Sequence, residues 1–180
     1  MERISENDVD CFLQQMAQVL APLPEMGKCR EEWRHLPGFR IWLPGSFQLA
    51  DRETAEEVFW SEALPEMLYM TEDGTAGITL QTMEDAEVTV QEVRQRLERL
   101  DERIVCYGSG AEKGGAGVRW LEYKSFAADG RVYNVLFLFR AGGCDRLGTF
   151  YCPYEEYGGW KPVVWEIMRT IEEENDHEGL

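Results

Sequence analysis

The stretch RVYNVLFLFR, residues 131–140, constrains the fold of this chain most strongly. Its apolar residues occupy both alternating sets of positions: Tyr133, Val135, Phe137 and Phe139 in one set, and Val132, Leu136 and Leu138 in the other. Successive side chains of a strand point to opposite faces of its sheet, so a strand here would be apolar on both faces. The pattern predicts a central strand with other structure packed against each side.

Further segments have the periodicity of strands and helices around this strand. Strands are expected within 38–47 and at 55–60, 66–71, 76–83, 103–108, 117–126 and 146–152, and helices at 89–103 and from Lys161 to Glu173. Thr89 and Glu92 are spaced as a capping box, which predicts the start of the first of these helices. Turn sequences at 72–74 and 128–130 join neighbouring strands, which indicates an antiparallel sheet. The expected fold class is therefore α+β, with helices packed on an antiparallel sheet.

Residues 7–21, NDVDCFLQQMAQVLA, have the pattern of a separate amphipathic helix. Its apolar residues recur with helical spacing along one face: Val9, Phe12, Leu13, Met16 and Leu20. Prolines at 22 and 24 end this helix, and residues 22–37 read as a connector. We therefore expect an N-terminal helix and connector at 1–37, one domain at 38–173 and an acidic flexible tail at 174–180. Residues 1–36 would be dispensable for folding, unless the apolar stripe of the helix covers a face of the sheet.

The charge of the chain narrows the classes of partner. The 180 residues carry a formal net charge of −16, with a pI near 4.5. Nucleic acids and anionic membranes are expected to be poor partners, because both are bound through Lys and Arg patches. A protein partner with basic character would be attracted. No apolar stretch approaches the roughly 20 residues needed to cross a bilayer, and MERISENDVD lacks signal-peptide features, so a cytoplasmic location is expected.

Signatures of catalysis, metal binding and cofactor binding are weak. The five cysteines are scattered without a CxxC pair, which predicts no metal site, although Cys144 and Cys152 could be spatial neighbours with a redox role. The glycine-rich stretch 108–117 lacks the GK[ST] of a phosphate loop, so no cofactor is expected. A catalytic triad would depend on His35, since the other histidine lies in the tail. No catalytic residues are predicted.

An aromatic corner extends over residues 147–173, LGTFYCPYEEYGGWKPVVWEIMRTIEE. Gly148 would share a strand face with Phe150, and a glycine there indicates close approach of another backbone or a bulky side chain. Trp160 is expected to be a buried plug that seats the last helix. The segment PYEEYGG reads as an exposed loop, in which aromatic rings beside carboxylates suit a protein contact. The candidate binding residues are Tyr154, Glu155, Glu156, Tyr157 and Trp160.

The element order, with FRIWLP as opening strand, LGTFYC as closing strand and a last helix entered through Trp160-Lys161-Pro162, resembles the PsbP-like family. The resemblance covers about residues 38–173 and implies an α/β/α sandwich. That group includes photosystem II extrinsic proteins, a nuclear-transport regulator that binds a small GTPase, and many bacterial proteins. The resemblance implies a non-catalytic binding protein and supplies no catalytic residues for this chain.

Two hypotheses of function follow. The first is a non-catalytic cytosolic binding or adaptor protein that engages a protein partner through an acidic, aromatic surface; accessory or immunity-type roles in bacteria would suit such a domain. The alternative is a small hydrolase-type enzyme with a carboxylate pair or His35 in a cleft. A well-formed pocket of catalytic groups would favour the enzyme, and a flat sheet face or an exposed aromatic patch would favour binding.

Overall fold

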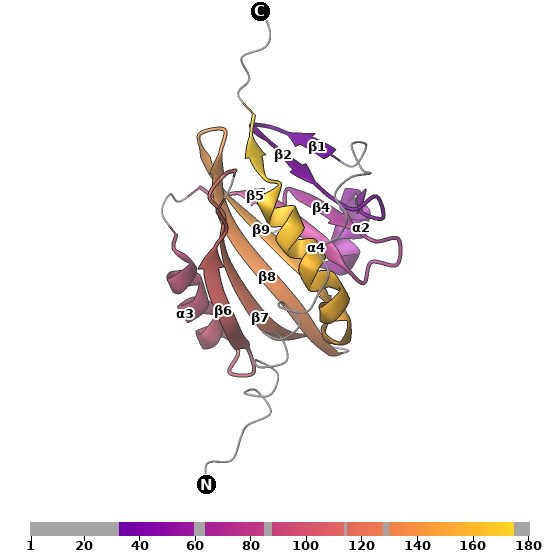
Figure 1. Ribbon diagram of the computed structural model, residues 1–180. Coiled ribbons are helices and arrows are strands. Elements are labelled where there is room, and N and C mark those ends of the chain that lie inside the picture. Colours follow the sequence, from indigo (N-terminus) through magenta and orange to yellow (C-terminus); the bar gives the residue numbers. More distant parts are fainter. Residues whose placement is uncertain (1–32, 60–63, 85–87, 114, 128–129, 175–180) are drawn as a thin grey trace, which may run out of the picture.

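The structure is a computed structural model that describes residues 33–59, 64–84, 88–113, 115–127 and 130–174 (Figure 1). A large antiparallel sheet has the strand order β3-β4-β5-β9-β8-β7-β6, and a small one has the order β1-β2-β10. The strands are β1 (Trp33–Leu36), β2 (Phe39–Trp42), β3 (Gln48–Leu49), β4 (Met67–Met70), β5 (Gly77–Thr82), β6 (Val105–Ala111), β7 (Arg119–Ala127), β8 (Gly130–Ala141), β9 (Cys144–Pro153) and β10 (Glu172–Glu173). The helices are α2 (Arg52–Val58), α3 (Val90–Leu100), the 3-10 helix η3 (Tyr154–Glu156) and α4 (Tyr157–Arg169). The α+β prediction is confirmed, while the expected helix at 7–21 lies outside the described residues.

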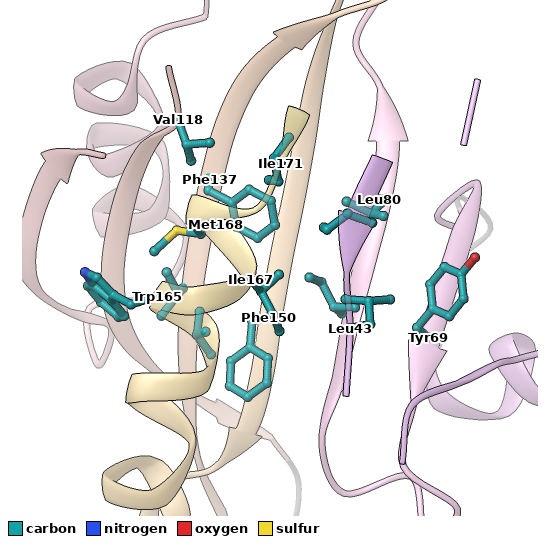
Figure 2. Packing of buried hydrophobic residues seen from close by; sticks show 14 of the residues in the cluster. Leu43, Tyr69, Leu80, Val118, Phe137, Phe150, Trp165, Ile167, Met168 and Ile171 are labelled. Carbon is teal, nitrogen blue, oxygen red and sulfur yellow. The ribbon is translucent and has the colours of Figure 1, made fainter. Parts of the chain in front are cut away.

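Strand β8 is the central strand that its two-sided apolar pattern predicts. It lies between β7 and β9, and seven consecutive residues of it, 133–139, are buried. On one face, its side chains pack with those of α4 and β2, and Figure 2 shows Ile167 and Met168 of α4 directed toward Phe137 and Phe150 of the sheet. This main core face is closed by the small sheet and α4 together.

The opposite face of the large sheet packs against α3 (Figure 1). Val93 and Leu97 of this helix pack on a smaller buried cluster: Leu121, Tyr123, Leu136 and Leu138. Thr89 and Glu92 form both reciprocal hydrogen bonds of the predicted capping box. The large sheet therefore lies between helices, as in the sandwich that the resemblance implies.

Gly148 of β9 lies opposite Phe137 of β8. A Cβ atom at position 148 would be 2.1 Å from Cζ of Phe137, far inside van der Waals contact. The phenyl ring therefore lies across the glycine backbone. The prediction that Gly148 marks the close approach of a bulky side chain is confirmed.

The expected strand at 55–60 is wrong, because Arg52–Val58 is helix α2. Alternation in AEEVFW suggested a strand, but the stronger local signal lies just upstream. The Asp51 carboxylate accepts a hydrogen bond from the Thr54 backbone N–H at 2.9 Å, which caps the helix. Arg52 and Glu56 then form an ion pair at i and i+4.

At both ends of the domain, the structure also differs from the sequence prediction. Residues 33–36, expected as part of a connector, form strand β1, in which Trp33 pairs with Trp42 of β2. The last helix begins at Tyr157, one turn before the expected Lys161, so Pro162 lies inside the helix and not in its first turn. It ends at Arg169, and residues 172–173 pair with β2 as strand β10. Local periodicity does not reveal β10, because its partners in β2 are more than a hundred positions away in sequence, whereas β1 and β2 are joined by the short Pro37-Gly38 turn.

Candidate functional site

Helix α3 covers only part of its face of the large sheet. Beside it lies a concave surface of about 870 Å³ that crosses strands β5, β9, β8 and β7. We call this surface the open face; six strand residues form its floor: Thr79, Tyr123, Val132, Asn134, Thr149 and Tyr151. Its rim includes Phe59 at the end of α2, Thr75 in the β4–β5 turn, and Arg131 and Glu155. The open face lies in the size range of ligand sites in proteins.

The strand register builds the centre of this surface. Tyr151 of β9 pairs with Gly77 of β5, and a Cβ at Gly77 would lie 2.5 Å from the Tyr151 hydroxyl oxygen. The glycine therefore allows the tyrosine ring to lie flat across β5. Phe59 meets the same ring edge-on, with 6.2 Å between ring centroids. An aromatic wall thus joins the end of α2 to the sheet.

The polar groups of the floor are neutral, and those of Asn134 and Thr79 form hydrogen bonds within the protein. Asn134 donates hydrogen bonds to Ser125 Oγ at 2.8 Å and to the Val132 carbonyl at 3.1 Å. The Thr79 hydroxyl donates to the Thr149 carbonyl at 3.4 Å, and the Tyr151 hydroxyl is buried without a partner among the described residues. The described part of the floor offers an occupant mainly apolar surface.

Burial also holds the floor tyrosines neutral. It raises the pKa of Tyr151 to about 12 and that of Tyr123 to about 12, from an ordinary value of 10.0. For Tyr123 a smaller contribution comes from the charge of Cys106. Removing each phenolate from water costs free energy that no neighbouring positive charge repays.

We expect Tyr151→Phe to leave stability near neutral pH unchanged or slightly higher, since the lost hydroxyl has no hydrogen-bond partner in the described structure. In the unfolded chain a tyrosine ionises near pH 10, and in the folded chain Tyr151 ionises near 12. As pH rises, Tyr151 therefore loses its proton first in the unfolded state. The stability that neutral Tyr151 contributes below pH 10 is lost as pH rises from about 10 through 12.

Denaturant melts at pH 7 and at pH 11 measure both parts of this prediction. The decrease in the free energy of unfolding between the two pH values should be smaller for Tyr151→Phe than for the wild type. An equal decrease in both proteins would show that Tyr151 is not desolvated.

The aromatic corner differs from the exposed loop expected at PYEEYGG. Tyr154 is only 5% exposed, and its ring lies under the Arg131 guanidinium at 4.7 Å and near the Lys124 ammonium at 5.3 Å. Its hydroxyl accepts a hydrogen bond from the hydroxyl of Tyr107 at 3.3 Å. Tyr157 is half-buried in the first turn of α4, with its ring 5.5 Å from that of Tyr133. The prediction of two exposed tyrosines is therefore wrong: both rings pack against the sheet.

The other three candidate residues lie at the surface of this corner. Glu155 accepts a hydrogen bond from Arg131 at 2.8 Å, which lowers the pKa of Glu155, and it lies on the rim of the open face. Glu156 is exposed and accepts from the Trp160 indole N–H at 3.3 Å. Trp160 is half-buried rather than the expected sealed plug, and packs against Phe150 on the α4 side. Of the five predicted binding residues, Glu155 lines the open face.

A buried ion pair under α4 was missed by sequence reasoning. Lys161 Nζ lies 2.7 Å from Glu122 Oε1 of β7, and the two side chains are 2% and 5% exposed. The Tyr133 hydroxyl donates to the same Glu122 oxygen at 2.9 Å. The alternation in RWLEYKSF, which places Glu122 and Lys124 between Trp120 and Phe126 on one strand face, was the available signal. Because the pair is sealed from solvent, it anchors α4 to the sheet and offers no surface to a ligand.

Of the residues considered for catalysis and redox chemistry, His35 and Cys144 do not line the open face, whereas Cys152 does. His35 is exposed on β1, and its Nδ1 lies 2.8 Å from a carboxylate oxygen of Glu174. Cys144 and Cys152 are at opposite ends of β9, so the possibility that they are neighbours is wrong. Burial raises the pKa of Cys152 well above its ordinary value, which keeps this thiol protonated.

The described residues offer neither a metal site nor a membrane-spanning helix. They contain no group of three or more His, Cys, Asp or Glu side chains placed to hold a metal ion. None of the described helices is both long and apolar enough to cross a membrane.

Comparisons with known proteins place this geometry in a fold class. No protein-family model matches the chain, and no curated protein matches its sequence. Among solved structures, the chain is similar to the cyanobacterial PsbP (CyanoP) of Synechocystis, with a TM-score of 0.55 and 12% identity, over 86% of this chain and 100% of that one. It is also similar to a protein of Bacteroides thetaiotaomicron, with a TM-score of 0.52 and 15% identity, over 83% of this chain and 50% of that one.

The fold is PsbP-like, as the element order in the sequence suggested. At these identities the likeness concerns the fold alone, so the function has to be argued from the surfaces of this chain.

Proposed function

We propose that this protein is a non-catalytic binding or adaptor protein of the cytoplasm that holds a segment of a protein partner on the open face. The observation that carries the proposal is the concavity of about 870 Å³ on a sheet face that α3 leaves partly uncovered. Its floor is mainly apolar, and the described polar groups there are neutral. A contiguous apolar concavity of this kind is a recurrent mark of an interaction site.

The chemistry of the surface indicates the kind of partner. An apolar segment would bury against Val132, Tyr123 and Tyr151, and large aromatic rings are common anchors of such contacts. The acidic charge of the chain, −16 overall, would speed the approach of a partner with basic residues beside its apolar segment. Glu155 on the rim is placed to meet such a residue. Its ion pair with Arg131 is exposed, so Glu155 could exchange Arg131 for a basic residue of the partner.

The enzyme alternative lacks a comparable arrangement. His35 does not line the open face, and Glu122, a buried carboxylate, is paired with Lys161 away from solvent. The charged groups that do line the open face, Arg131 and Glu155, are paired with each other on its rim. This arrangement does not provide the two free carboxylates that glycoside hydrolysis uses.

We expect Thr149→Arg to abolish partner capture. Thr149 lies on the floor of the open face, where a long charged side chain would fill the concavity and could not be desolvated without cost. The control is Ser109→Arg, the same kind of change at an exposed position of strand β6 that does not line the open face. Tagged full-length wild type and both variants would be used to capture proteins from cells of the source organism, followed by quantitative mass spectrometry.

The proposal requires a protein that the wild type and Ser109→Arg both capture, and whose yield falls at least tenfold with Thr149→Arg. Circular dichroism melts of the three proteins establish that each is folded. Equal capture by Thr149→Arg and wild type would contradict a role of the open face in binding.

A further inference from the structure

One carboxamide, that of Asn134 on β8, lies at the middle of the open face. Asn134 pairs with Tyr123 of β7 on one side and with Tyr151 of β9 on the other. Directly paired residues are neighbours on one face of a sheet, so a tyrosine stands on each side of the asparagine. Asn134 is 6% exposed and lines the open face. Its side chain is therefore held against whatever occupies this surface.

The Asn134 carboxamide is fixed in one orientation. Its Nδ2 atom donates to Ser125 Oγ at 2.8 Å and to the Val132 carbonyl oxygen at 3.1 Å. A backbone carbonyl only accepts hydrogen bonds, so Val132 determines which of the two amide atoms faces it. Both amide protons are used in this way, while Oδ1 accepts no hydrogen bond from any residue that the structure describes. The unpaired atom of this buried side chain is therefore an acceptor.

This acceptor sets a requirement on the occupant. An occupant that covers Oδ1 with apolar atoms leaves it unpaired and pays the cost of desolvating it, whereas an occupant with a donor at this point does not. Turning the amide over to present Nδ2 would break the bond to the Val132 carbonyl. The hydroxyls of Tyr123 and Thr149 rotate to donate or accept as needed, so they impose no such choice. Asn134 therefore selects for a hydrogen-bond donor.

The surroundings of Asn134 narrow the kind of donor. Lysine and arginine would bring a positive charge onto a floor whose described residues include no carboxylate, and burying an unpaired charge is costly. Asparagine, glutamine and tyrosine would bring an acceptor that needs a partner of its own. The indole of tryptophan has one donor, no acceptor and a large apolar body. Tyr151 and Phe59 supply an aromatic wall beside it.

We propose that the occupant of the open face is anchored by a tryptophan side chain, whose indole N–H donates to Asn134 Oδ1. The inference rests on the proposed function, in which the occupant is a segment of a protein partner, and it names the side chain that this segment carries. Tryptophan is among the side chains that most often dominate protein interfaces. The concavity is wider than one indole, so apolar neighbours of the tryptophan fill the remaining floor.

Two small probes test the anchor without the partner. The first is N-acetyl-tryptophan amide, and the second is the same molecule with a 3-benzothienyl ring, which keeps the size and shape of indole but has sulfur in place of the N–H. Each is titrated into the ¹⁵N-labelled full-length chain, and affinities are read from amide shift changes. Nuclear Overhauser effects between the indole N–H proton and the β protons of Asn134 place the donor directly.

We expect the tryptophan probe to shift the amides of Thr79, Asn134 and Thr149, and the benzothienyl probe to bind about fivefold or more weakly. Thr149→Arg should prevent the binding of both probes. Asn134→Leu removes the acceptor, so its affinities for the two probes should agree within about twofold. Equal affinities in the wild type, shift changes elsewhere, or no binding of the tryptophan probe up to its solubility limit would overturn the proposal. The probe pair and the Overhauser effects use the wild type, so they decide even if Asn134→Leu does not fold.

Partner capture with Thr149→Arg separates this inference from the proposed function. If the wild type does not distinguish the probes while Thr149→Arg still abolishes capture, the tryptophan anchor is wrong and the proposed function stands. If the probes are distinguished but capture is insensitive to Thr149→Arg, the indole site stands and the proposed function is wrong. If both are right, Asn134→Leu should also reduce capture of the same partner, by about fivefold or more.

Discussion

Lys161→Met is expected to destabilise the protein by about 3–5 kcal/mol, the cost of leaving one member of a buried ion pair uncompensated. The Lys161 ammonium lies 2.7 Å from Glu122 Oε1, and both side chains are almost fully buried. Methionine would keep much of the packing against Trp165, whose ring centroid is 5.3 Å from Nζ. The loss would therefore come from the isolated Glu122 carboxylate, which would keep the Tyr133 hydroxyl as a donor.

The double variant Lys161→Met with Glu122→Gln isolates this cause. Glutamine keeps the shape of the side chain and can still accept from Tyr133, so the double variant should be more stable than Lys161→Met alone. Urea melts of the wild type, the two single variants and the double variant give the coupling energy. If the double variant is no more stable than Lys161→Met, the damage comes from lost packing of α4 and not from the unpaired charge.

Gly148→Ala is expected to destabilise the protein by about 3 kcal/mol, at the upper end of the usual range for overpacking a core. The new methyl group would lie 2.1 Å from Cζ of Phe137, and both residues are in the central pair of strands. Relief would require the phenyl ring to move, and this ring is fully buried between α4 and the sheet. The free energy of unfolding from denaturant melts measures the effect.

Phe137→Leu supplies the matched test of this clash. The smaller side chain leaves room for the alanine methyl group, so Gly148→Ala should cost less in a Phe137→Leu background than in the wild type. As a control, Gly158→Ala places a methyl group on the exposed side of α4, where nothing lies within 4 Å, and should not destabilise. Equal costs of Gly148→Ala in both backgrounds would contradict the packing described here.

The sequence predicts the elements whose signals are local. Strand β8 was expected at the centre because its residues are apolar on both faces, and α3 because of its capping box. Helix α2 was missed because AEEVFW alternates like a strand, although Asp51 and Thr54 carry the signal of a cap. Strand β10 exists through pairing with β2, and residues 172–173 are more than a hundred positions from their partners. Such pairing is decided by tertiary structure and leaves no periodic trace.

The candidate site was less predictable, for a related reason. The floor of the open face forms where Thr79 meets Thr149 and Gly77 meets Tyr151, contacts that join residues more than 60 positions apart. The corner residues were recognised as aromatic, but the sequence did not show that Tyr154 packs inward under Arg131. A strand glycine such as Gly77 was the available hint, since it allows a bulky side chain to cross its strand.

The most direct test of the open face as a binding surface is a map of contacts by nuclear magnetic resonance. Amide spectra of the ¹⁵N-labelled full-length chain would be recorded with and without an unlabelled partner obtained by capture. The account predicts that the largest shift changes lie at the floor and rim: Phe59, Thr79, Tyr123, Val132, Thr149, Tyr151 and Glu155. Shift changes confined to the outer side of α4, around Trp160 and Glu156, would contradict it.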